Sequence, residues 1–292
     1  MQVQNILKIY YGIDISIEGY GYFIYQNQRY YFCYVENIQQ FLDVYHYYRY
    51  LMHQCGCEGY SLVKNNNQDI VSDQHILLVY HPGDFSFQSY LQLFLQPMIT
   101  QKIRIAEIKE QWIHKIDCVR EHVKDYAYSF KYDQDVISLI YYYCGIAENG
   151  INILNEILKI DQEASITMSL SLKEPINNYV YEILNPCHYI FSSRSRELLC
   201  LIRSHMLSYH DLQELLEYQY YDVYEILYLF ARTLYSATFF EQIIYKQMNS
   251  QIIQDYYFHL EEEKEMYREM MRILSFYVTL PKISWINGEN MV

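Results

Sequence analysis

Glycine and cationic residues are scarce in this chain of 292 residues. It has nine glycines, and 22 lysines plus arginines against 35 aspartates plus glutamates, so its formal net charge is −13. Sites for phosphates, nucleotides or nucleic acid normally need glycine turns and cations. A chain of this charge repels duplexes and anionic membranes, and no basic stripe with interleaved aromatic residues stands out. We therefore expect no nucleic-acid partner.

Long apolar runs are also missing. The longest, residues 136–147, is far shorter than the roughly 20 residues that a membrane span needs. The N-terminus, MQVQNILKIYYGID, lacks the cationic start and the long apolar stretch of a signal peptide. We expect a soluble protein that is made in the cytosol and has no membrane span.

The seven cysteines form no CxxC pair. An odd number at scattered positions predicts reduced, mostly buried thiols. His53, Cys55 and Cys57 offer three soft metal ligands, but no fourth ligand lies nearby in the sequence, and a helix that ends at a glycine turn explains the spacing better. We expect neither a metal site nor a cofactor.

Tyrosine is the residue in excess, with 36 copies. Its ring packs against apolar groups, and its hydroxyl forms hydrogen bonds. One explanation is an AT-rich genome, which inflates tyrosine, isoleucine and asparagine but should also inflate lysine. The other is a protein surface built for contacts, in which exposed tyrosines form contiguous patches. Residues 10–34 and 218–235 are the candidates for such patches.

The first 84 residues have the pattern of a β-rich lobe. Aromatic and β-branched segments split by turn residues predict antiparallel strands at 10–16, 19–25 and 30–35. Apolar residues at helical spacing, followed by a glycine, predict a helix over 37–54. A polar turn between residues 60–63 and 74–80 predicts a further hairpin. The expected lobe is a five-stranded antiparallel sheet with one helix.

Helical periodicity dominates after the sequence His81-Pro82-Gly83-Asp84, which marks the expected hinge. Periodic apolar residues predict helices at 86–95, 100–124, 134–160, 209–219, 221–235, 238–248 and 251–276. Short apolar runs at 179–184 and 198–202 predict a small β insertion. The sequence thus predicts an α+β, bilobal fold on the plan of protein kinases, with a β-rich lobe over 1–84 and a helical lobe over 85–292.

Three segments of the helical part carry a resemblance to a known family. Residues 141–154, YYYCGIAENGINIL, are similar to a "GxAENAI" helix; residues 208–216, SYHDLQELL, to an "RDLAxxL" helix start; and residues 229–240, LFARTLYSATFF, to an "LARLLYPxxYF" segment. Together with Trp112 in a long helix, they resemble the bacterial spore coat kinase-like proteins of the CotS and YutH type. That family lies within the aminoglycoside phosphotransferase-like branch of the protein-kinase-like fold.

Phosphoryl transfer in that fold needs a strand lysine, a catalytic aspartate, and an asparagine and an aspartate that hold magnesium. The lysine is missing, since none occurs between Lys8 and Lys64. The third predicted strand carries Cys33 and Tyr34 where the lysine is expected, and Arg29, which precedes it, is no substitute for a compact ammonium group. The next helix contains only Asp43 as an acid, with Glu36 at its margin. Gly19 and Gly21 echo a glycine loop, but two glycines in a tyrosine-rich hairpin are better read as turn residues.

The catalytic loop is degraded as well. The active branch reads "CHGDxxxxN"; here Cys187 and His188 match, but Ile190 occupies the aspartate position and Ser195 the asparagine position. The run 198–202, expected to be a strand that ends in a magnesium aspartate, continues into Arg203, which would repel the metal.

Other candidate residues have simpler explanations. Asp211 superficially mimics the catalytic aspartate, but the asparagine position is Leu216, and an N-terminal helix cap explains Asp211 better. His188 has no visible acidic partner and fits a packed remnant. His205 and His210 could share a metal ion, but no third ligand is apparent.

The resemblance implies a spore coat component that is made in the cytoplasm of the mother cell and deposited on the spore, with other coat proteins as partners. Because the required side chains are missing, we expect a pseudokinase rather than an enzyme, with no catalytic, cofactor-binding or metal-binding residues. Two alternatives remain open. The first is an ATP-dependent small-molecule phosphotransferase with displaced catalytic residues, and the second is a module that binds a ligand other than a nucleotide.

Overall fold

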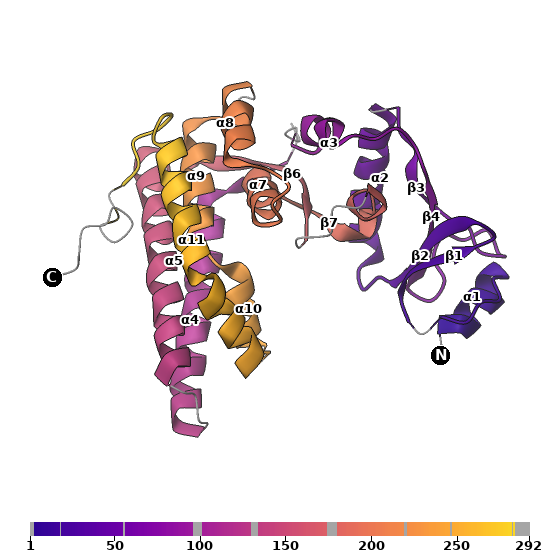
Figure 1. The fold of residues 1–292 in the computed structure, drawn as a ribbon, viewed down its shortest axis with the longest axis horizontal. Coiled ribbons are helices and arrows are strands. Elements are labelled where there is room, and N and C mark those ends of the chain that lie inside the picture. Colours follow the sequence, from indigo (N-terminus) through magenta and orange to yellow (C-terminus); the bar gives the residue numbers. More distant parts are fainter. Residues whose placement is uncertain are drawn as a thin grey trace. The chain divides into compact units, whose positions relative to one another are not determined.

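The computed structural model describes residues 3–17, 19–54, 56–95, 101–129, 134–173, 180–218, 221–245, 247–281 and 283. The chain divides into two compact units, one of Met1–Gln96 with Ser169–Ser192 and the other of Pro97–Met168 with Ser193–Val292. The expected boundary at His81–Asp84 therefore lies inside the first unit, and a segment expected in the helical lobe belongs with the β-rich part. Within the described residues, no helix combines the length and apolarity needed to cross a membrane. The structure is α+β, as the sequence predicts (Figure 1).

A four-stranded antiparallel sheet forms the centre of the first unit. Its strands are β1 (Gly21–Tyr25), β2 (Gln28–Tyr34), β3 (Gly59–Leu62) and β4 (His75–His81), in the spatial order β1-β2-β4-β3. The hairpin between β1 and β2 turns at Gln26 and Asn27, whose φ angles of 49° and 61° suit a two-residue turn with the twist of the strands. The predicted pairs of strands at 19–25 with 30–35 and at 60–63 with 74–80 are both present.

The predicted first strand at 10–16 is wrong, and the sheet has four strands rather than five. Helix α1 (Val3–Tyr11) takes its place and buries Ile6 and Leu7 against one face of the sheet. The helix ends at Gly12, whose φ is +68°, with backbone bonds from Gly12 to Lys8 and from Ile13 to Leu7. The bond from Gly12 to the carbonyl four residues before it is the αL motif at a helix C-terminus, which a glycine favours. The short aromatic run before Gly12 therefore forms the end of a helix and not a strand.

Helix α2 (Ile38–Gln54) confirms the helix predicted over 37–54. The side chain of Asn37 accepts a hydrogen bond from the Gln40 amide at 3.0 Å and caps the N-terminus. Its buried residues recur at helical spacing and include Phe41, Val44 and Tyr48. The hydroxyl of Tyr48 accepts a hydrogen bond from the Tyr60 amide at 2.7 Å, so a hydrogen bond connects this helix to the edge strand β3.

The remaining elements of the first unit follow the strands. Helix α3 (Phe87–Phe94) confirms the helix predicted at 86–95 and comes after the expected hinge. Strand β6 (Ser165–Leu172) passes from the second unit into the first. It leads to the short helix α6 (Val180–Ile183), the 3-10 turn Pro186–His188, and strand β7 (Tyr189–Ser193). Neither β6 nor β7 was among the predicted strands.

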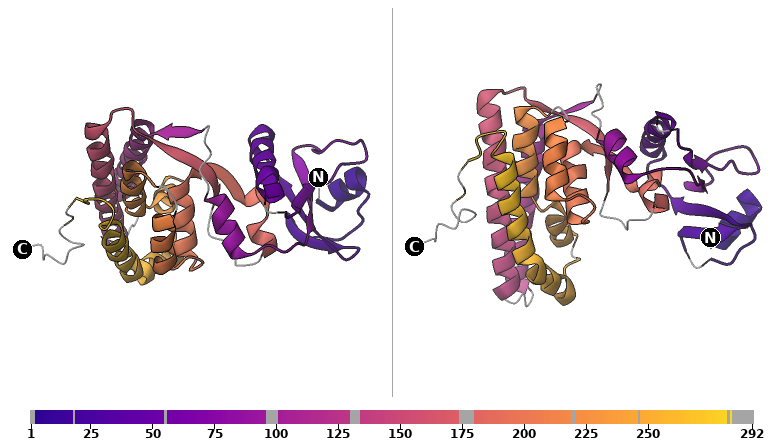
Figure 2. Two further views of the ribbon diagram at one scale, coloured as in Figure 1. Left: turned by 90° about the horizontal axis from the view of Figure 1, so that it is seen from above. Right: turned by 45° about the horizontal axis from the view of Figure 1, so that its top comes forward.

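Long helices make up most of the second unit (Figure 2). Helix α5 packs against both α4 and α9. The helices are α4 (Ile105–Ser129), α5 (Gln134–Ile160), α7 (Arg194–Arg203), α8 (Tyr209–Tyr218), α9 (Val223–Thr233), α10 (Ala237–Ile244) and α11 (Ser250–Leu274). A short strand, β5 (Lys102–Arg104), pairs antiparallel with the start of β6. The helix predicted at 134–160 has the predicted bounds, and the other five predicted for this unit are present with shifted ends.

The predicted strand at 198–202 is wrong, because this run lies inside helix α7. Ser193 caps the helix by accepting the Arg196 amide at 3.3 Å, and Leu198, Leu199, Leu201 and Ile202 are buried. A short apolar run that is buried on all sides has no periodicity, so the pattern does not separate a strand from a helix.

Aromatic stacking and one close helix contact define the centre of the second unit. Trp112 stacks on Tyr235 with the ring centroids 4.1 Å apart. A Cβ atom on Gly150 would lie 2.8 Å from the Ala231 carbonyl oxygen, so this glycine allows α5 and α9 to approach closely. Arg194 and Glu225 form a buried ion pair, and the Arg194 guanidinium lies 4.1 Å from the ring centroid of Tyr221.

Candidate functional site

The candidate site is the face of the first unit's sheet that points away from α1. Side chains alternate between the two faces of a strand. Phe23 and Phe32 pack with α1, so Tyr22, Tyr31 and Cys33 point to the opposite face. Tyr22 and Tyr31 are cross-strand partners, and their ring centroids are 4.6 Å apart.

Asn185 attaches the segment that contains Cys187 and His188 to this face. Its side-chain oxygen accepts the Cys187 amide at 3.0 Å and so caps the 3-10 turn. Its side-chain amide donates to the Tyr22 hydroxyl, also at 3.0 Å. Asn185 is fully buried, and burial raises the pKa of Tyr22 well above its usual value. The loop that would carry catalytic groups is therefore held by a structural amide.

His188 packs among aromatic rings. Its ring makes edge-on contacts with Tyr31, at 5.8 Å between centroids, and with Tyr22, at 6.3 Å. Its Nδ1 lies 3.1 Å from the backbone oxygen of Glu182, so Nδ1 is the protonated nitrogen and donates to a carbonyl. A histidine that acts as a general base is normally oriented by a carboxylate, whereas a backbone carbonyl orients this one.

Arg29, which precedes the predicted lysine strand, is also held by an aromatic contact. The Arg29 guanidinium lies 3.6 Å from the ring centroid of Tyr181, which is cation–π geometry. Asp43, the acid of α2, is exposed and accepts a hydrogen bond from Gln39 at 2.9 Å. It does not supply an ion-pair partner to the face described above.

A pocket of about 440 Å³ opens beside Tyr31 and Cys33. Its lining residues come from β2, from α2 and the turn before it, from Lys173, and from the 3-10 turn and the start of β7. They are Tyr31, Cys33, Tyr34, Val35, Glu36, Asn37, Gln40, Phe41, Val44, Lys173, Cys187, Tyr189 and Ile190. Glu36 and Lys173 are its charged side chains, and the Lys173 ammonium donates to the Cys187 carbonyl at 2.7 Å. The volume is within the range of pockets that hold small molecules.

Cys33 and Cys187 bring two sulfur atoms together at this pocket. Their Sγ atoms are 3.3 Å apart, although 154 positions separate the residues in the sequence. Both thiols are free. Burial, followed by the contact with Cys33, raises the pKa of the Cys187 thiol well above its usual value. The sequence predicted reduced and mostly buried cysteines but did not single out these two as a pair.

Ile190, at the expected aspartate position, also lines this pocket, but the other residues named from the sequence do not join the site. Gly21 has a φ of +130° and is the first residue of strand β1, rather than the turn residue that the sequence suggested. Ile190 lies in β7, and Ser195 is buried in α7. Arg203 is exposed at the end of α7, in the second unit. Of the three possible soft ligands considered in the sequence, His53 is exposed and Cys57 is buried, and Cys55 lies outside the described residues.

Asp211 is a capping residue, as predicted, but at the third helical position. Its carboxylate accepts from the amide and hydroxyl of Ser208, and its own amide donates to the Ser208 hydroxyl at 3.1 Å. This reciprocal pair is a capping box at the start of α8. The hydrogen bonds from Ser208 lower the pKa of Asp211. Ligand atoms of His210, Asp211 and Glu214 lie within 4.8 Å of one another, but all three side chains are exposed, and His205 is not among them.

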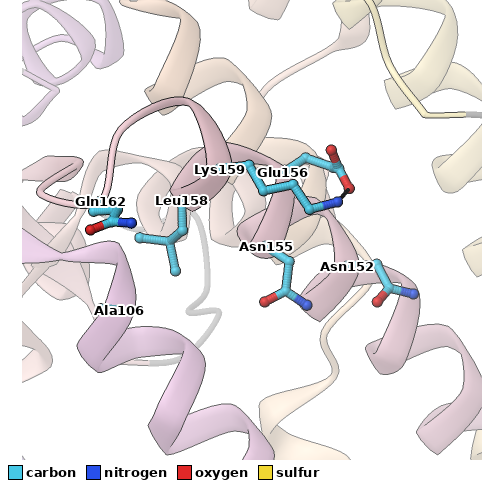
Figure 3. A pocket seen from close by; sticks show the side chains of 7 residues that line it. All are labelled: Ala106, Asn152, Asn155, Glu156, Leu158, Lys159 and Gln162. Atoms are coloured by element: carbon cyan, nitrogen blue, oxygen red, sulfur yellow. Dashed lines mark hydrogen bonds and ion pairs between the residues drawn. The ribbon is translucent and has the colours of Figure 1, made fainter.

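A second groove, of about 540 Å³, lies in the second unit along the end of α5 (Figure 3). Asn152 and Asn155 line it, while the Lys159 ammonium is bonded to Glu156 at 2.6 Å. The two side-chain amides offer donors and acceptors to a polar ligand. The sequence marked no chemistry at these positions.

Comparisons with models of protein families, with curated proteins and with solved structures found no match. The family resemblance of the sequence thus remains an expectation.

Sequence reasoning missed how the site residues meet. Tyr22, Asn185 and the Cys33–Cys187 contact were not singled out as a group. The signal available for this contact was the resemblance to kinase-like proteins. It places Cys33 on the strand expected to carry the lysine and Cys187 in the expected catalytic loop.

Proposed function

We propose that this chain is a kinase-like spore coat protein without phosphotransferase activity, which acts by binding other coat proteins. The resemblance of segments 141–154, 208–216 and 229–240 supplies the family and the setting. The mother-cell cytoplasm, and then the spore coat, is the proposed location. Function still has to be argued from the site, because one fold supports many activities.

The arrangement of the first unit supports a kinase-like lobe. Along the chain it has two paired strands, helix α2 and two further paired strands, as expected for the part that follows the first strand of such a lobe. Helix α1 replaces that first strand. The second unit is mainly helical, which also agrees with the proposal.

The observation that carries the proposal is the filling of the sheet face by Tyr22, Tyr31 and His188. In an active phosphotransferase this region needs cations and carboxylates that hold phosphates and magnesium. Here Cys33 is at the lysine strand, and Asn185 bonds to a tyrosine. This aromatic filling favours a structural role for the loop over a chemical one.

Tyrosine contributes both to the core and to the surface. Seven tyrosines are among the largest fully buried side chains, so much of the excess serves packing. In the candidate region 218–235, Tyr228 and Tyr235 are buried, whereas Tyr220 and the side chain of Tyr218 lie outside the description. The region 10–34 offers Tyr20 and Tyr34, which are 54% and 47% exposed.

Tyr20 and Tyr34 form an exposed aromatic pair around His75, which we call the Tyr20–Tyr34 patch. Tyr20 stacks on His75 with ring centroids 5.6 Å apart, and Tyr34 contacts the same ring edge-on at 5.4 Å. Tyrosine combines a large contact area with a low cost in conformational entropy. We propose this patch as the contact surface for the partner coat protein.

A nucleotide-binding assay tests the first half of the proposal. We expect no change in melting temperature with millimolar ATP and magnesium, because a ligand raises stability only when it binds the folded state. A rise of several degrees, or transfer of labelled phosphate to a small molecule, would support the phosphotransferase alternative instead.

An incorporation assay tests the second half. The double variant Tyr20→Ser/Tyr34→Ser should lose incorporation into the coat, whereas Tyr245→Ser, at a residue 69% exposed in the second unit, should keep it. Both proteins must first have a melting temperature close to that of the unchanged chain. If both variants are incorporated equally, then the base composition of the genome alone would explain the surface tyrosines.

The pocket beside Cys33 favours a second candidate, a binding module for a small ligand that is not a nucleotide. Its volume of about 440 Å³ and its oppositely charged residues, Glu36 and Lys173, suit a small polar molecule. A thermal-shift screen of amino acids and sugars should then find a hit that Lys173→Met abolishes. Absence of any hit, with coat incorporation intact, favours the structural role.

A further inference from the structure

Two segments that are remote in sequence place their thiols side by side in the first unit. Cys33 comes from β2, and Cys187 lies in the 3-10 turn Pro186–His188. Their sulfurs, 3.3 Å apart, are in contact but not bonded. A disulfide has a sulfur–sulfur bond of about 2.05 Å, so the two atoms must approach by roughly 1.3 Å.

Both cysteines also line the pocket beside β2, which provides a route for a small reagent. Among the six cysteines that the structure describes, these are the two whose sulfurs are in contact. Cys144 and Cys200 are buried, and Cys118 lies 3.7 Å from Nε2 of His114 on the same helix. A tetrahedral zinc ion fits less well, because sulfurs at about 2.3 Å from the metal lie roughly 3.8 Å apart and four ligands are needed.

We propose that Cys33 and Cys187 form a reversible disulfide by exchange with a low-molecular-weight disulfide that enters this pocket. The bond ties strand β2 to the loop that carries His188. This thiol chemistry goes beyond the coat function proposed above and does not depend on it.

The exchange proceeds in two steps that balance. One cysteine loses its proton to solvent, and its thiolate attacks a sulfur of the reagent, which breaks the reagent's S–S bond and releases one small thiolate. The second cysteine, also deprotonated, then attacks the protein sulfur of the mixed disulfide and expels the second small thiolate. The protein loses two electrons and two protons, and the reagent gains them as two thiols.

The surroundings of the pair determine how fast the first step runs. Burial raises the pKa of the Cys187 thiol, so little thiolate is present at neutral pH. The Lys173 ammonium, bonded to the Cys187 carbonyl, favours the thiolate. We therefore expect slow oxidation that is complete only over long incubation.

Peptide mapping of the full chain tests the proposal. The reduced protein is incubated at pH 8.5 with the disulfide of 2-mercaptoethanol, its remaining thiols are alkylated, and it is digested with trypsin. Cys33 falls in the peptide 30–49 and Cys187 in the peptide 174–194. We expect these two peptides to be joined, to separate on reduction, and to be joined in most molecules at the end of the reaction.

Two variants serve as controls. Cys33→Ser should abolish the joined peptide, whereas Cys118→Ser, which removes a partly exposed cysteine of the second unit, should leave its yield unchanged. The melting temperature of the unchanged chain should rise by roughly 5 °C on oxidation, because the bond constrains a long loop in the unfolded state. Cys118→Ser should show the same rise and Cys33→Ser none.

Several results would overturn the inference. If both cysteines are recovered alkylated, or each carries 2-mercaptoethanol without a joined peptide, then the pair does not exchange. If hydrogen peroxide yields the joined peptide and the small disulfide does not, then the assigned oxidant is wrong. Should Cys33→Ser fail to fold, the mapping of the unchanged chain and of Cys187→Ala decides the question.

Discussion

The side chain of Asn185 joins two parts of the first unit by donating to the hydroxyl of Tyr22 at 3.0 Å. The two residues are 163 positions apart. The same side chain accepts the Cys187 amide, so one buried amide both shapes the 3-10 turn and fixes it to strand β1.

A double-mutant cycle tests this link. Asn185→Ala should lower the free energy of unfolding by about 2–3 kcal/mol, because it leaves buried groups without partners. Tyr22→Phe should cost about 1 kcal/mol. The double variant should lose less stability than the sum of the two single losses, since each substitution removes the same hydrogen bond. Asn67→Ala, at an exposed turn position, is the control and should change stability by less than about 0.5 kcal/mol. Fully additive losses, measured by urea unfolding, would contradict the link.

Two glycines of α5 should respond in opposite directions to the same change. An added Cβ at Gly145 meets nothing within 4 Å, so Gly145→Ala should stabilise the helix by about 1 kcal/mol through propensity. At Gly150 the Cβ would lie 2.8 Å from the Ala231 carbonyl, so Gly150→Ala should destabilise by about 1–3 kcal/mol. Thermal unfolding of both variants measures these changes. Equal shifts in melting temperature would show that α5 and α9 are not in close contact.

The buried ion pair of Arg194 and Glu225 should be sensitive to loss of one partner. Glu225→Gln leaves a buried guanidinium without its counter-ion and should cost about 3–5 kcal/mol. The exposed pair Arg268–Glu265 is the matched control, and Glu265→Gln should cost less than about 1 kcal/mol. If urea unfolding gave both variants the same stability, the Arg194 pair would not be desolvated.

Tyrosine ionisation should make the protein unstable at high pH. Burial raises the pKa of Tyr221 and of Tyr256 to about 12, above the usual value of 10.0. A raised pKa in the folded state means that the stabilisation is fully present below about pH 10 and is lost as the pH rises toward about 12.

Absorbance at the phenolate band and circular dichroism measure this together. Exposed tyrosines should ionise near pH 10 with the fold intact, and the rest should ionise as the helical signal is lost. The variant Tyr256→Phe, which removes the bond to Gln242, should make stability fall less steeply between pH 10 and 12. An unchanged slope would show that Tyr256 ionises normally in the folded protein.

The sequence by itself determined the strongly periodic elements. The apolar spacing of residues 134–160 predicted α5 with its observed bounds, and the break between the predicted strands 19–25 and 30–35 marked the turn between β1 and β2. The capping role of Asp211 was also local, since Ser208 lies three residues away. Such features depend on neighbours in the chain, so their signals can be read without a fold.

Tertiary structure decided the rest. The short apolar runs near Tyr10 and Leu198 fit either a strand or a helix, and packing against β2 and inside the second unit selected helices. Strand β6 needs a partner far away in the sequence, so its own pattern was too weak to mark it. The contact between Cys33 and Cys187 spans 154 positions, and no local pattern encodes it. Only the fold brings these two sulfurs together, because the pairing of strands sets which remote residues share a face.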